Sequence, residues 1–332
     1  MDFNLDETQQ DLKKLAAEVL AREGDAGDRM WQAGLLSVCV PEEAGGAGLG
    51  PVEMAVVLRE VGARAAPVTA LPTLVSTLVL ARYGTLDQQR RFTGGPDEGG
   101  GRATVALREP GRALADPPLT SARAEGDGWV LTGRKVSVPY PGAPVLVTAD
   151  EGLFVVESPP ATPEFTSTGE PAATIVLDGT PAERVAGSEA VTGAGQLFMA
   201  AVAAQASGVL AGALELTTAY IKGRKQFGRA LAEFQAVTMQ IADVYIAGRA
   251  LDVAMWSAVW RLGEGLEADR DLALAAYHVS EAVKALYTCQ HLHGGLGLDV
   301  TYPLHRYFAQ AKHLSQLLGG ADAQLDLIGA LV

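Results

Sequence analysis

Apolar residues recur at helical spacing near the start of the chain, which places them on one helix face. This first set consists of Leu12, Leu15, Val19 and Leu20. A glycine-rich loop over residues 41–50 interrupts the pattern, and a second helix is predicted to begin near Pro51. Residues 1 to about 97 are therefore predicted to be helical.

Short runs of β-forming residues replace this pattern between about residues 98 and 188. The runs are Ala103–Leu107, Trp129–Thr132, Val145–Thr148, Leu153–Val156 and Thr174–Leu177. Gly, Pro and Asp separate them, which is typical of strands joined by turns. This segment is predicted to form a small antiparallel barrel or sandwich.

Helical spacing returns from about residue 189. One seam of apolar residues runs from Val237 to Leu262, and another runs from Leu272 to Leu286. Seams of this kind pack helices into bundles. The sequence therefore predicts an α+β chain with an N-terminal helical domain (1–97), a middle β domain (98–188) and a C-terminal four-helix bundle (189–332).

The longest apolar stretch, from Leu197 to Leu214, lies in this last region. It contains Gln205 and many alanines, so a buried helix is predicted rather than a membrane span. Ala204, Gly208 and Gly212 form a stripe of small residues along it. A neighbouring helix is therefore expected to approach this stripe closely.

Composition and charge narrow the classes of function. The 332 residues are 48% hydrophobic and 20% charged, as in globular proteins. The net charge of −13 argues against nucleic acid, whose phosphates need a basic surface. Cys39 and Cys289 form no CxxC pair, and the acidic N-terminus does not resemble a signal peptide. A cytoplasmic protein without nucleic-acid or membrane partners is expected.

Two glycine-containing motifs carry the candidate chemistry. One is Arg224-Lys225-Gln226-Phe227-Gly228, with Gln235 seven residues further on, and the other is Gly294-Gly295-Leu296-Gly297. An arginine offers a planar fork of N–H donors to phosphate oxygens. A Gly-Gly turn lets backbone amides approach a diphosphate. Together the motifs could hold the diphosphate and adenine half of a flavin.

Each motif also has a simpler interpretation. Arg224 could be a solvated arginine at a helix end, and the glycine pair could be a helix C-cap. Cys289, His291 and His293 suggest zinc ligands, but no fourth ligand is evident, so no metal site is predicted. The glycine run of residues 45–50 lacks the context of a dinucleotide loop and is predicted to be a tight loop.

Taken together, the motifs resemble the acyl-CoA dehydrogenase family over nearly the whole chain. Further resemblance is carried by Trp31 with Gly34-Leu35-Leu36, by Val40-Pro41-Glu42-Glu43, by Arg108-Glu109-Pro110-Gly111, and by Tyr302-Pro303-Leu304 with Arg306-Tyr307 and Lys312. The family implies FAD and an acyl-CoA substrate. A carboxylate removes the proton α to the thioester carbonyl while flavin N5 accepts the β-hydride. An electron-transfer acceptor is a further expected partner.

The two positions at which this family carries its catalytic carboxylate hold apolar residues here. These positions are Leu318 and Phe198, and an arginine that often assists acyl-CoA binding is replaced by Met199. Neither leucine nor phenylalanine accepts a proton, so no catalytic residue is assigned. The carboxylates that could act as a relocated base are Glu215, Glu233, Asp243 and Glu281.

Residues that contact the redox ring in the family are replaced, whereas those that reach a neighbouring subunit's flavin are kept. The loop after Arg108 lacks the family's Ser and Asp, and Ser137 and Pro139 replace its Trp and Thr. The resemblance assigns cofactor binding to Arg224, Phe227, Gln235, His291, Gly294 and Gly295. His291 stands where the family often has Gln, and the adjacent Gln290 is an alternative donor.

This distribution resembles the non-catalytic subunit of the heteromeric α2β2 acyl-CoA dehydrogenases of bacterial steroid degradation. It implies a heterotetramer in which a second subunit carries the catalytic Glu and binds the acyl-CoA, while this chain completes that subunit's FAD site. Two alternatives stay open. One is a catalytically competent homotetramer with a relocated base, and the other is a flavin-free partner subunit with a structural role.

Overall fold

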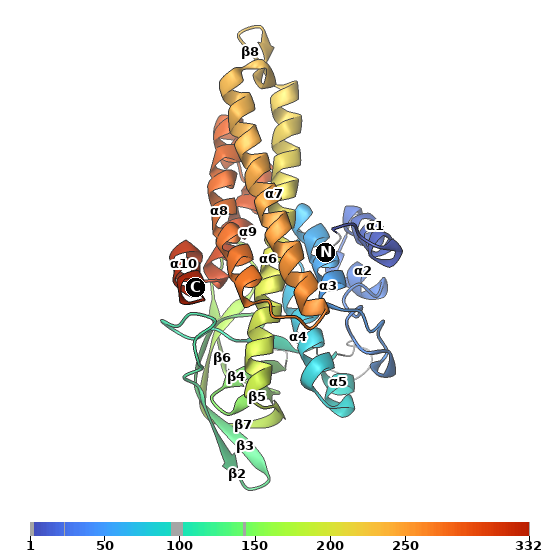
Figure 1. The fold of residues 1–332 in the computed structure, drawn as a ribbon, viewed down its shortest axis with the longest axis vertical. Coiled ribbons are helices and arrows are strands. Elements are labelled where there is room, and N and C mark those ends of the chain that lie inside the picture. The colour runs from blue at the N-terminus through green and yellow to red at the C-terminus, as the bar shows by residue number, and fades with distance from the viewer. Residues whose placement is uncertain (1–2, 23, 94–101, 142–143, 332) are drawn as a thin grey trace. The chain divides into compact units, whose positions relative to one another are not determined.

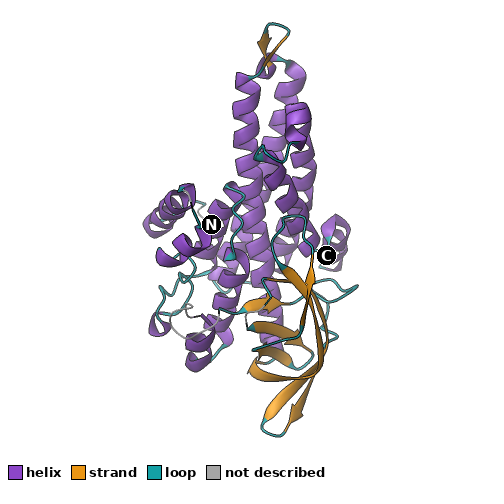
Figure 2. Cartoon of the chain, turned by 180° about the vertical axis from the view of Figure 1, so that it is seen from behind, coloured by secondary structure: helices purple, strands orange, loops and turns teal. Residues whose placement is uncertain are grey.

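The computed structural model describes residues 3–22, 24–93, 102–141 and 144–331. Helices, a β-sheet and a helical bundle follow one another along the chain (Figures 1 and 2), so the predicted α+β fold is confirmed. The bundle unit comprises Met1–Leu20, Ala55–Pro67 and Val202–Val332, and the sheet unit comprises Ala21–Met54 and Val68–Ala201. The division into three domains stays a prediction, and its boundary at residues 97 and 98 lies outside the described residues.

Two helices contribute several residues to each unit, and the other elements lie in one unit each apart from Ala21, the last residue of α1. The shared helices are α3 (Pro51–Ala63) and α6 (Ser188–Gly223). The bundle unit holds α1 (Glu7–Ala21), β8 (Lys225–Gln226), β9 (Arg229–Ala230), η3 (Leu231–Glu233), α7 (Gln235–Gly263), α8 (Asp269–His293), η4 (Gly294–Leu298), α9 (Leu304–Leu317) and α10 (Gly320–Ala330). The sheet unit holds α2 (Ala26–Gln32), η1 (Glu42–Ala44), α4 (Ala70–Tyr83), α5 (Leu86–Thr93), β1 (Thr104–Ala106), β2 (Ser121–Glu125), β3 (Gly128–Pro139), β4 (Val145–Ala149), β5 (Gly152–Val156), β6 (Ala161–Glu164) and β7 (Ala172–Ala186).

Within the described residues the strands of the sheet unit form a seven-stranded sheet in the order β1-β4-β5-β7-β3-β2, with β6 also paired to β7. The runs predicted from β-forming residues coincide with parts of β1, β3, β4, β5 and β7. The sequence pattern misses β2 and β6, because their side chains are mostly exposed and show no apolar alternation. β1 and β4 pair in parallel, so the antiparallel expectation is wrong at that edge of the sheet.

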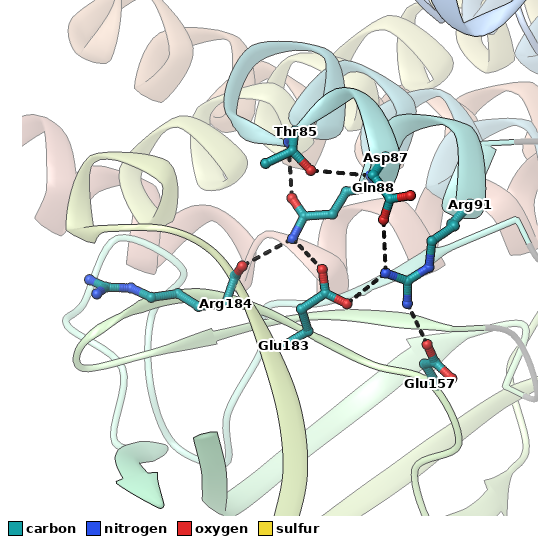
Figure 3. Close-up of polar contacts among 7 residues, drawn as sticks. All are labelled: Thr85, Asp87, Gln88, Arg91, Glu157, Glu183 and Arg184. Atoms are coloured by element: carbon teal, nitrogen blue, oxygen red, sulfur yellow. Dashed lines mark hydrogen bonds and ion pairs between the residues drawn. The ribbon is translucent and has the colours of Figure 1, made fainter. Parts of the chain in front are cut away.

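Reciprocal hydrogen bonds fix the start of α5 in the sheet unit. The Gln88 N–H donates to Thr85 Oγ1 at 3.2 Å, and the Thr85 N–H donates to Gln88 Oε1 at 3.0 Å, which is a capping box. One turn later Arg91 forms ion pairs of 2.7 Å with Glu157 and 2.9 Å with Glu183 (Figure 3). These contacts attach α5 to the end of β5 and to β7.

The predicted close approach of a helix to the small-residue stripe of α6 is confirmed, and the partner is α3. A Cβ placed on Gly208 of α6 would lie 1.9 Å from the Arg59 carbonyl oxygen. A Cβ placed on Gly62 of α3 would lie 2.0 Å from the Gln205 carbonyl oxygen. Because each helix presents a glycine to the backbone of the other, only glycine fits at either position.

The apolar seams predicted for the bundle lie inside it. Val244, Leu251 and Met255 of α7 are almost fully buried, as are most seam residues of α8. The most apolar window of α6 is long enough to cross a membrane, but 89% of it is buried within the structure, so the predicted buried helix is confirmed. Leu15 of α1 is 40% exposed, in contrast to Leu12 and Val19.

Candidate functional site

The first motif forms a hairpin at one end of the bundle unit, next to the label β8 in Figure 1. Gln226 pairs with Arg229, and the two residues between them have positive φ, 51° at Phe227 and 80° at Gly228. A two-residue turn with both φ values positive suits glycine at each position. Phenylalanine in the left-handed region costs about 1–2 kcal/mol. Phe227 is nevertheless there, and its side chain is 91% exposed.

Ring contacts and a hydrogen bond connect the hairpin to the residues that follow it, although its tip is exposed. The Phe227 ring meets the Phe234 ring edge-on at 6.3 Å, and the Arg229 guanidinium lies 4.0 Å from the centroid of Phe234. The Ala230 N–H donates to Glu233 Oε1 at 3.1 Å. This network holds Phe227 in a defined, solvent-facing position, and such backbone strain is concentrated at functional sites.

Arg224 lies between the end of α6 and the hairpin, with its backbone fixed on both sides. Its N–H donates to the Tyr220 carbonyl at 2.8 Å, and its carbonyl accepts from the Leu231 N–H at 2.9 Å. The side chains of Arg224 and of Gln235, the first residue of α7, are exposed. Among the described residues the Arg224 guanidinium has no ion-pair partner, so its donors can bind an external anion.

The second motif forms the turn after α8. Gly294 adopts φ 61° and ψ −140°, and its N–H donates to the His291 carbonyl. A Cβ added to Gly294 or Gly295 would meet nothing within 4 Å, so this side of the turn is open. The Gly294 amide is already paired inside the protein, so it cannot donate to a diphosphate. What remains of the expectation is the Gly295 amide and the open space beside the two glycines.

The alternative donor Gln290 is already used inside the protein. Its Nε2 donates to the Gly297 carbonyl at 3.3 Å, and a Cβ on Gly297 would lie 2.7 Å from the Gln290 carbonyl oxygen. Gln290 therefore holds the turn closed. His291 is exposed and stays the candidate at the position where a glutamine was expected.

The structure brings the hairpin and the glycine turn to the same end of the bundle unit. The Tyr220 ring stacks on the His293 ring with centroids 4.3 Å apart. His293 immediately precedes Gly294, and Arg224 follows Tyr220 by one helical turn, about 6 Å along the axis. The residues next to the two motifs, Tyr220 and His293, are therefore in contact, although 69 positions of sequence separate Arg224 from His293.

The strand at which the family's ring contacts were expected has an irregular backbone. β3 has a register shift against β7 between Lys135 and Val138, and Ser137 has a φ of 53°. Tyr140 has a φ of 51°, and its hydroxyl donates to Glu170 at 2.8 Å. Burial, together with the charge and hydrogen bond of Glu170, raises the pKa of Tyr140.

A buried ion pair behind this strand was not recognised from the sequence. Lys135 is 0% exposed, and its Nζ lies 2.7 Å from Glu109 Oε1 and 3.0 Å from Thr148 Oγ1. Glu109 also accepts hydrogen bonds from the Leu119 and Thr120 amides. Burial alone would raise the pKa of Glu109, but these donors and the charge of Lys135 outweigh it and lower that pKa. A small cavity lined by Glu109, Thr148 and the Arg112–Leu114 loop adjoins the pair.

Both positions at which a catalytic carboxylate was sought are closed to solvent. Phe198 in the sheet unit and Leu318 in the bundle unit are each 3% exposed, and Met199 is 8% exposed. Among the described residues of the bundle unit, the buried carboxylates Glu60 and Asp252 are both paired with arginines. Asp252 accepts hydrogen bonds from Ser207 and from Arg59, so its oxygens are engaged inside the protein.

The carboxylates proposed as relocated bases have other surroundings. Glu233 caps the hairpin, and Glu281 pairs with Lys284 at 2.7 Å. Glu215 and Asp243 are exposed on helices α6 and α7.

The described residues contain no group of three His, Cys, Asp or Glu side chains that could hold a metal ion. Burial raises the pKa of the Cys289 thiol to about 11, although a Thr217 hydrogen bond opposes this.

A fold of helices, sheet and bundle in this order is the one expected of a flavin-dependent dehydrogenase, and the comparisons with known proteins identify that class. Residues 6–95 match the model described as acyl-CoA dehydrogenase, N-terminal domain, and residues 189–332 match acyl-CoA dehydrogenase, C-terminal domain. The chain belongs to the acyl-CoA dehydrogenase family. Membership makes it a relative of oxidoreductases whose cofactor is FAD.

Individual relatives cover the whole chain. Acyl-CoA dehydrogenase FadE28 of Mycobacterium tuberculosis is 41% identical, over 99% of this chain and 98% of its own. Acyl-CoA dehydrogenase FadE27 of the same organism is 32% identical, with the same coverage. A solved structure described as a Tcur3481–Tcur3483 steroid ACAD variant superimposes with a TM-score of 0.90 and 38% identity, over 98% of this chain and 97% of that chain. The ChsE4–ChsE5 complex from Mycobacterium tuberculosis gives a TM-score of 0.89 and 31% identity, over 99% and 98%.

Proposed function

We propose that this chain is the non-catalytic subunit of a heteromeric, FAD-dependent acyl-CoA dehydrogenase and completes the FAD site of its partner. The observation that carries the proposal is the Arg224 hairpin. It holds a guanidinium with no ion-pair partner in the described part of the chain, and a strained, exposed Phe227, at one end of the bundle unit. Both become useful when a second subunit presents a flavin dinucleotide to them.

The residues of this site fit the diphosphate and adenine half of FAD. Arg224 would bind phosphate oxygens through its planar donors, and Phe227 would cover the adenine ring. Gln235 and His291 would donate hydrogen bonds at the rim, and the side of Gly294 and Gly295 that carries no Cβ would leave room for the diphosphate. When bound, FAD accepts the hydride from the substrate. This chain contributes binding and orientation, and the proton is removed by a glutamate of the partner.

The partner is proposed to be a second acyl-CoA dehydrogenase subunit in a heterotetramer. Two relatives of known structure support this, because one is described as a Tcur3481–Tcur3483 steroid ACAD and the other as a ChsE4–ChsE5 complex. By the same likeness the substrate is proposed to be a steroid-derived acyl-CoA thioester, oxidised in the partner's site. An electron-transfer acceptor then reoxidises the FAD. A cytoplasmic location is part of the proposal.

Flavin content and turnover of the chain alone and of the co-expressed complex test this function. The chain alone is expected to bind no stoichiometric FAD and to oxidise no acyl-CoA. The complex is expected to bind FAD and to oxidise the acyl-CoA. Counting FAD per heterodimer from the flavin absorbance band shows how many sites are filled. Stoichiometric FAD and turnover by the chain alone would establish the competent homotetramer instead. If substitutions in the Arg224 hairpin leave the FAD content of the complex unchanged, this chain is a structural subunit that does not bind the flavin.

Replacing Phe227 with glycine is expected to affect stability and cofactor retention in opposite directions. Glycine adopts the positive φ without strain, so the free energy of unfolding of the chain should stay constant or rise by up to about 1 kcal/mol. The complex should release FAD faster, because the aromatic cover is lost. Denaturant titration and the rate of FAD release measure the two effects. Faster release accompanied by a matching loss of stability would contradict a binding role for Phe227.

A further inference from the structure

Three aromatic rings lie together next to the glycine turn in the bundle unit. The ring of His293 contacts two tyrosines. Tyr220 stacks on it at 4.3 Å with an interplanar angle of 20°, and Tyr302 lies at 5.3 Å with an angle of 52°. His293 is only 3% exposed. Its ring is therefore an internal part that does not itself reach a bound cofactor.

Hydrogen bonds define the protonation of His293. Its Nδ1 lies 2.8 Å from the Cys289 carbonyl oxygen, which can only accept, so Nδ1 carries the proton. Its Nε2 lies 3.2 Å from the Tyr302 hydroxyl and accepts from it. Burial lowers the pKa of His293, and the bond to Cys289 partly offsets this. The ring is thus neutral, with both nitrogens engaged and its orientation fixed.

A continuous chain of contacts leads from the glycine turn to the arginine. The Tyr220 hydroxyl donates to the His293 carbonyl at 3.4 Å, and this carbonyl belongs to the peptide that enters Gly294. The Tyr220 carbonyl accepts the Arg224 N–H at 2.8 Å. Tyr220 therefore contacts the backbone of both parts of the site, through its side chain on one side and its main chain on the other.

We infer that His293 and Tyr220 are positioning residues that set the separation between Arg224 and the Gly294 turn, and so match the site to a diphosphate. The inference rests on the proposed function, in which these two parts bind the partner's FAD. Tyr302 supports the pair through its hydroxyl, which lies 3.2 Å from His293 Nε2. The Thr217–Cys289 contact also joins α6 to α8 in this region. Of the side-chain hydrogen bonds that Tyr220 and Thr217 form within the described residues, however, only that of the Tyr220 hydroxyl reaches the peptide that enters Gly294.

The test compares two variants of the assembled heteromeric complex. Each variant loses one tyrosine hydroxyl, so the chemical change is the same. Tyr220→Phe keeps the stacked ring and removes the bond to the turn, whereas Tyr307→Phe removes a 2.9 Å bond to the Ala63 carbonyl elsewhere in the same unit. The loss of one hydrogen bond corresponds to about 2- to 10-fold in an equilibrium or rate. We expect Tyr220→Phe to release FAD about 2- to 10-fold faster, and Tyr307→Phe to release it at the unaltered rate.

A double variant separates positioning from general stability. If Tyr220 acts through the site, Tyr220→Phe added to Arg224→Ala releases FAD no faster than Arg224→Ala alone. Additive effects, or equal effects of Tyr220→Phe and Tyr307→Phe, would overturn the positioning role. His293→Phe, which keeps a ring but removes both nitrogen contacts, should act in the same direction as Tyr220→Phe. If Arg224→Ala itself leaves FAD release unchanged, the proposed function is wrong. If Arg224→Ala accelerates release but Tyr220→Phe does not, only the positioning role is wrong.

Discussion

Replacement of Lys135 with methionine is expected to lower the free energy of unfolding by about 3–5 kcal/mol, the typical effect of removing one partner of a buried ion pair. Methionine has a similar volume, so the loss comes from Glu109, which stays buried and charged without its cation. Glu109 is 7% exposed and accepts backbone N–H bonds that hold it in place. Urea denaturation followed by circular dichroism measures the change.

The pH dependence of stability and a second substitution test whether the unpaired charge of Glu109 causes the loss of stability. The pKa of Glu109 is lowered in the folded protein, so its stabilising contribution is present above its unfolded pKa of about 4.3 and is lost as the pH falls through the folded value. In the variant the pKa of Glu109 rises, and the difference from the unaltered protein should shrink towards low pH. Adding Glu109→Gln should recover part of the stability. A loss that is independent of pH and unaffected by Glu109→Gln would indicate a packing defect instead.

Replacement of Arg224 with alanine is expected to weaken FAD retention by the heteromeric complex about 10- to 100-fold. Hydrogen bonds to a charged group contribute about 1.5–3 kcal/mol, and the Arg224 guanidinium has no protein partner among the described residues to lose. The stability of the chain itself should therefore hardly change. FAD bound after gel filtration and the rate of FAD release are the two measurements.

Arg270→Ala is the matched control for this variant. Arg270 is also an exposed arginine of the bundle unit, but it lies at the start of α8, the opposite end of that helix from Gly294. It carries the same charge, so its removal reports any general electrostatic effect. Equal FAD retention by the Arg224 and Arg270 variants would refute the site and favour a purely structural subunit.

The fold could be predicted from sequence because it depends on local patterns. Apolar spacing predicts the helices, and the motif around Arg224 and Phe227 indicates the candidate site, but its hairpin was not recognised from the sequence. The details depend on tertiary contacts and could not be predicted. The burial of Lys135 follows from its pairing with Glu109, a residue 26 positions away. The amide of Gly294 is unavailable to a ligand because α8 continues as far as the turn.

The exposed strands β2 and β6 also could not be predicted from local sequence patterns. β2 and β6 contribute few buried side chains, so their sequence carries no alternation, and only their neighbours β3 and β7 define them. The strain at Phe227 also has no local signal, because the residue type favours an ordinary strand and only the register of the hairpin forces its φ to 51°.

The reciprocal glycine contact between α3 and α6 limits how this chain can exchange parts with its relatives. Gly62 and Gly208 each touch the main chain of the opposite helix, so neither surface tolerates a partner of different shape. A chimaera that takes residues 55–67 from one parent and residues 202–223 from another would bring mismatched surfaces together. The two segments have to be inherited as a pair, even though more than a hundred residues of the sheet unit lie between them.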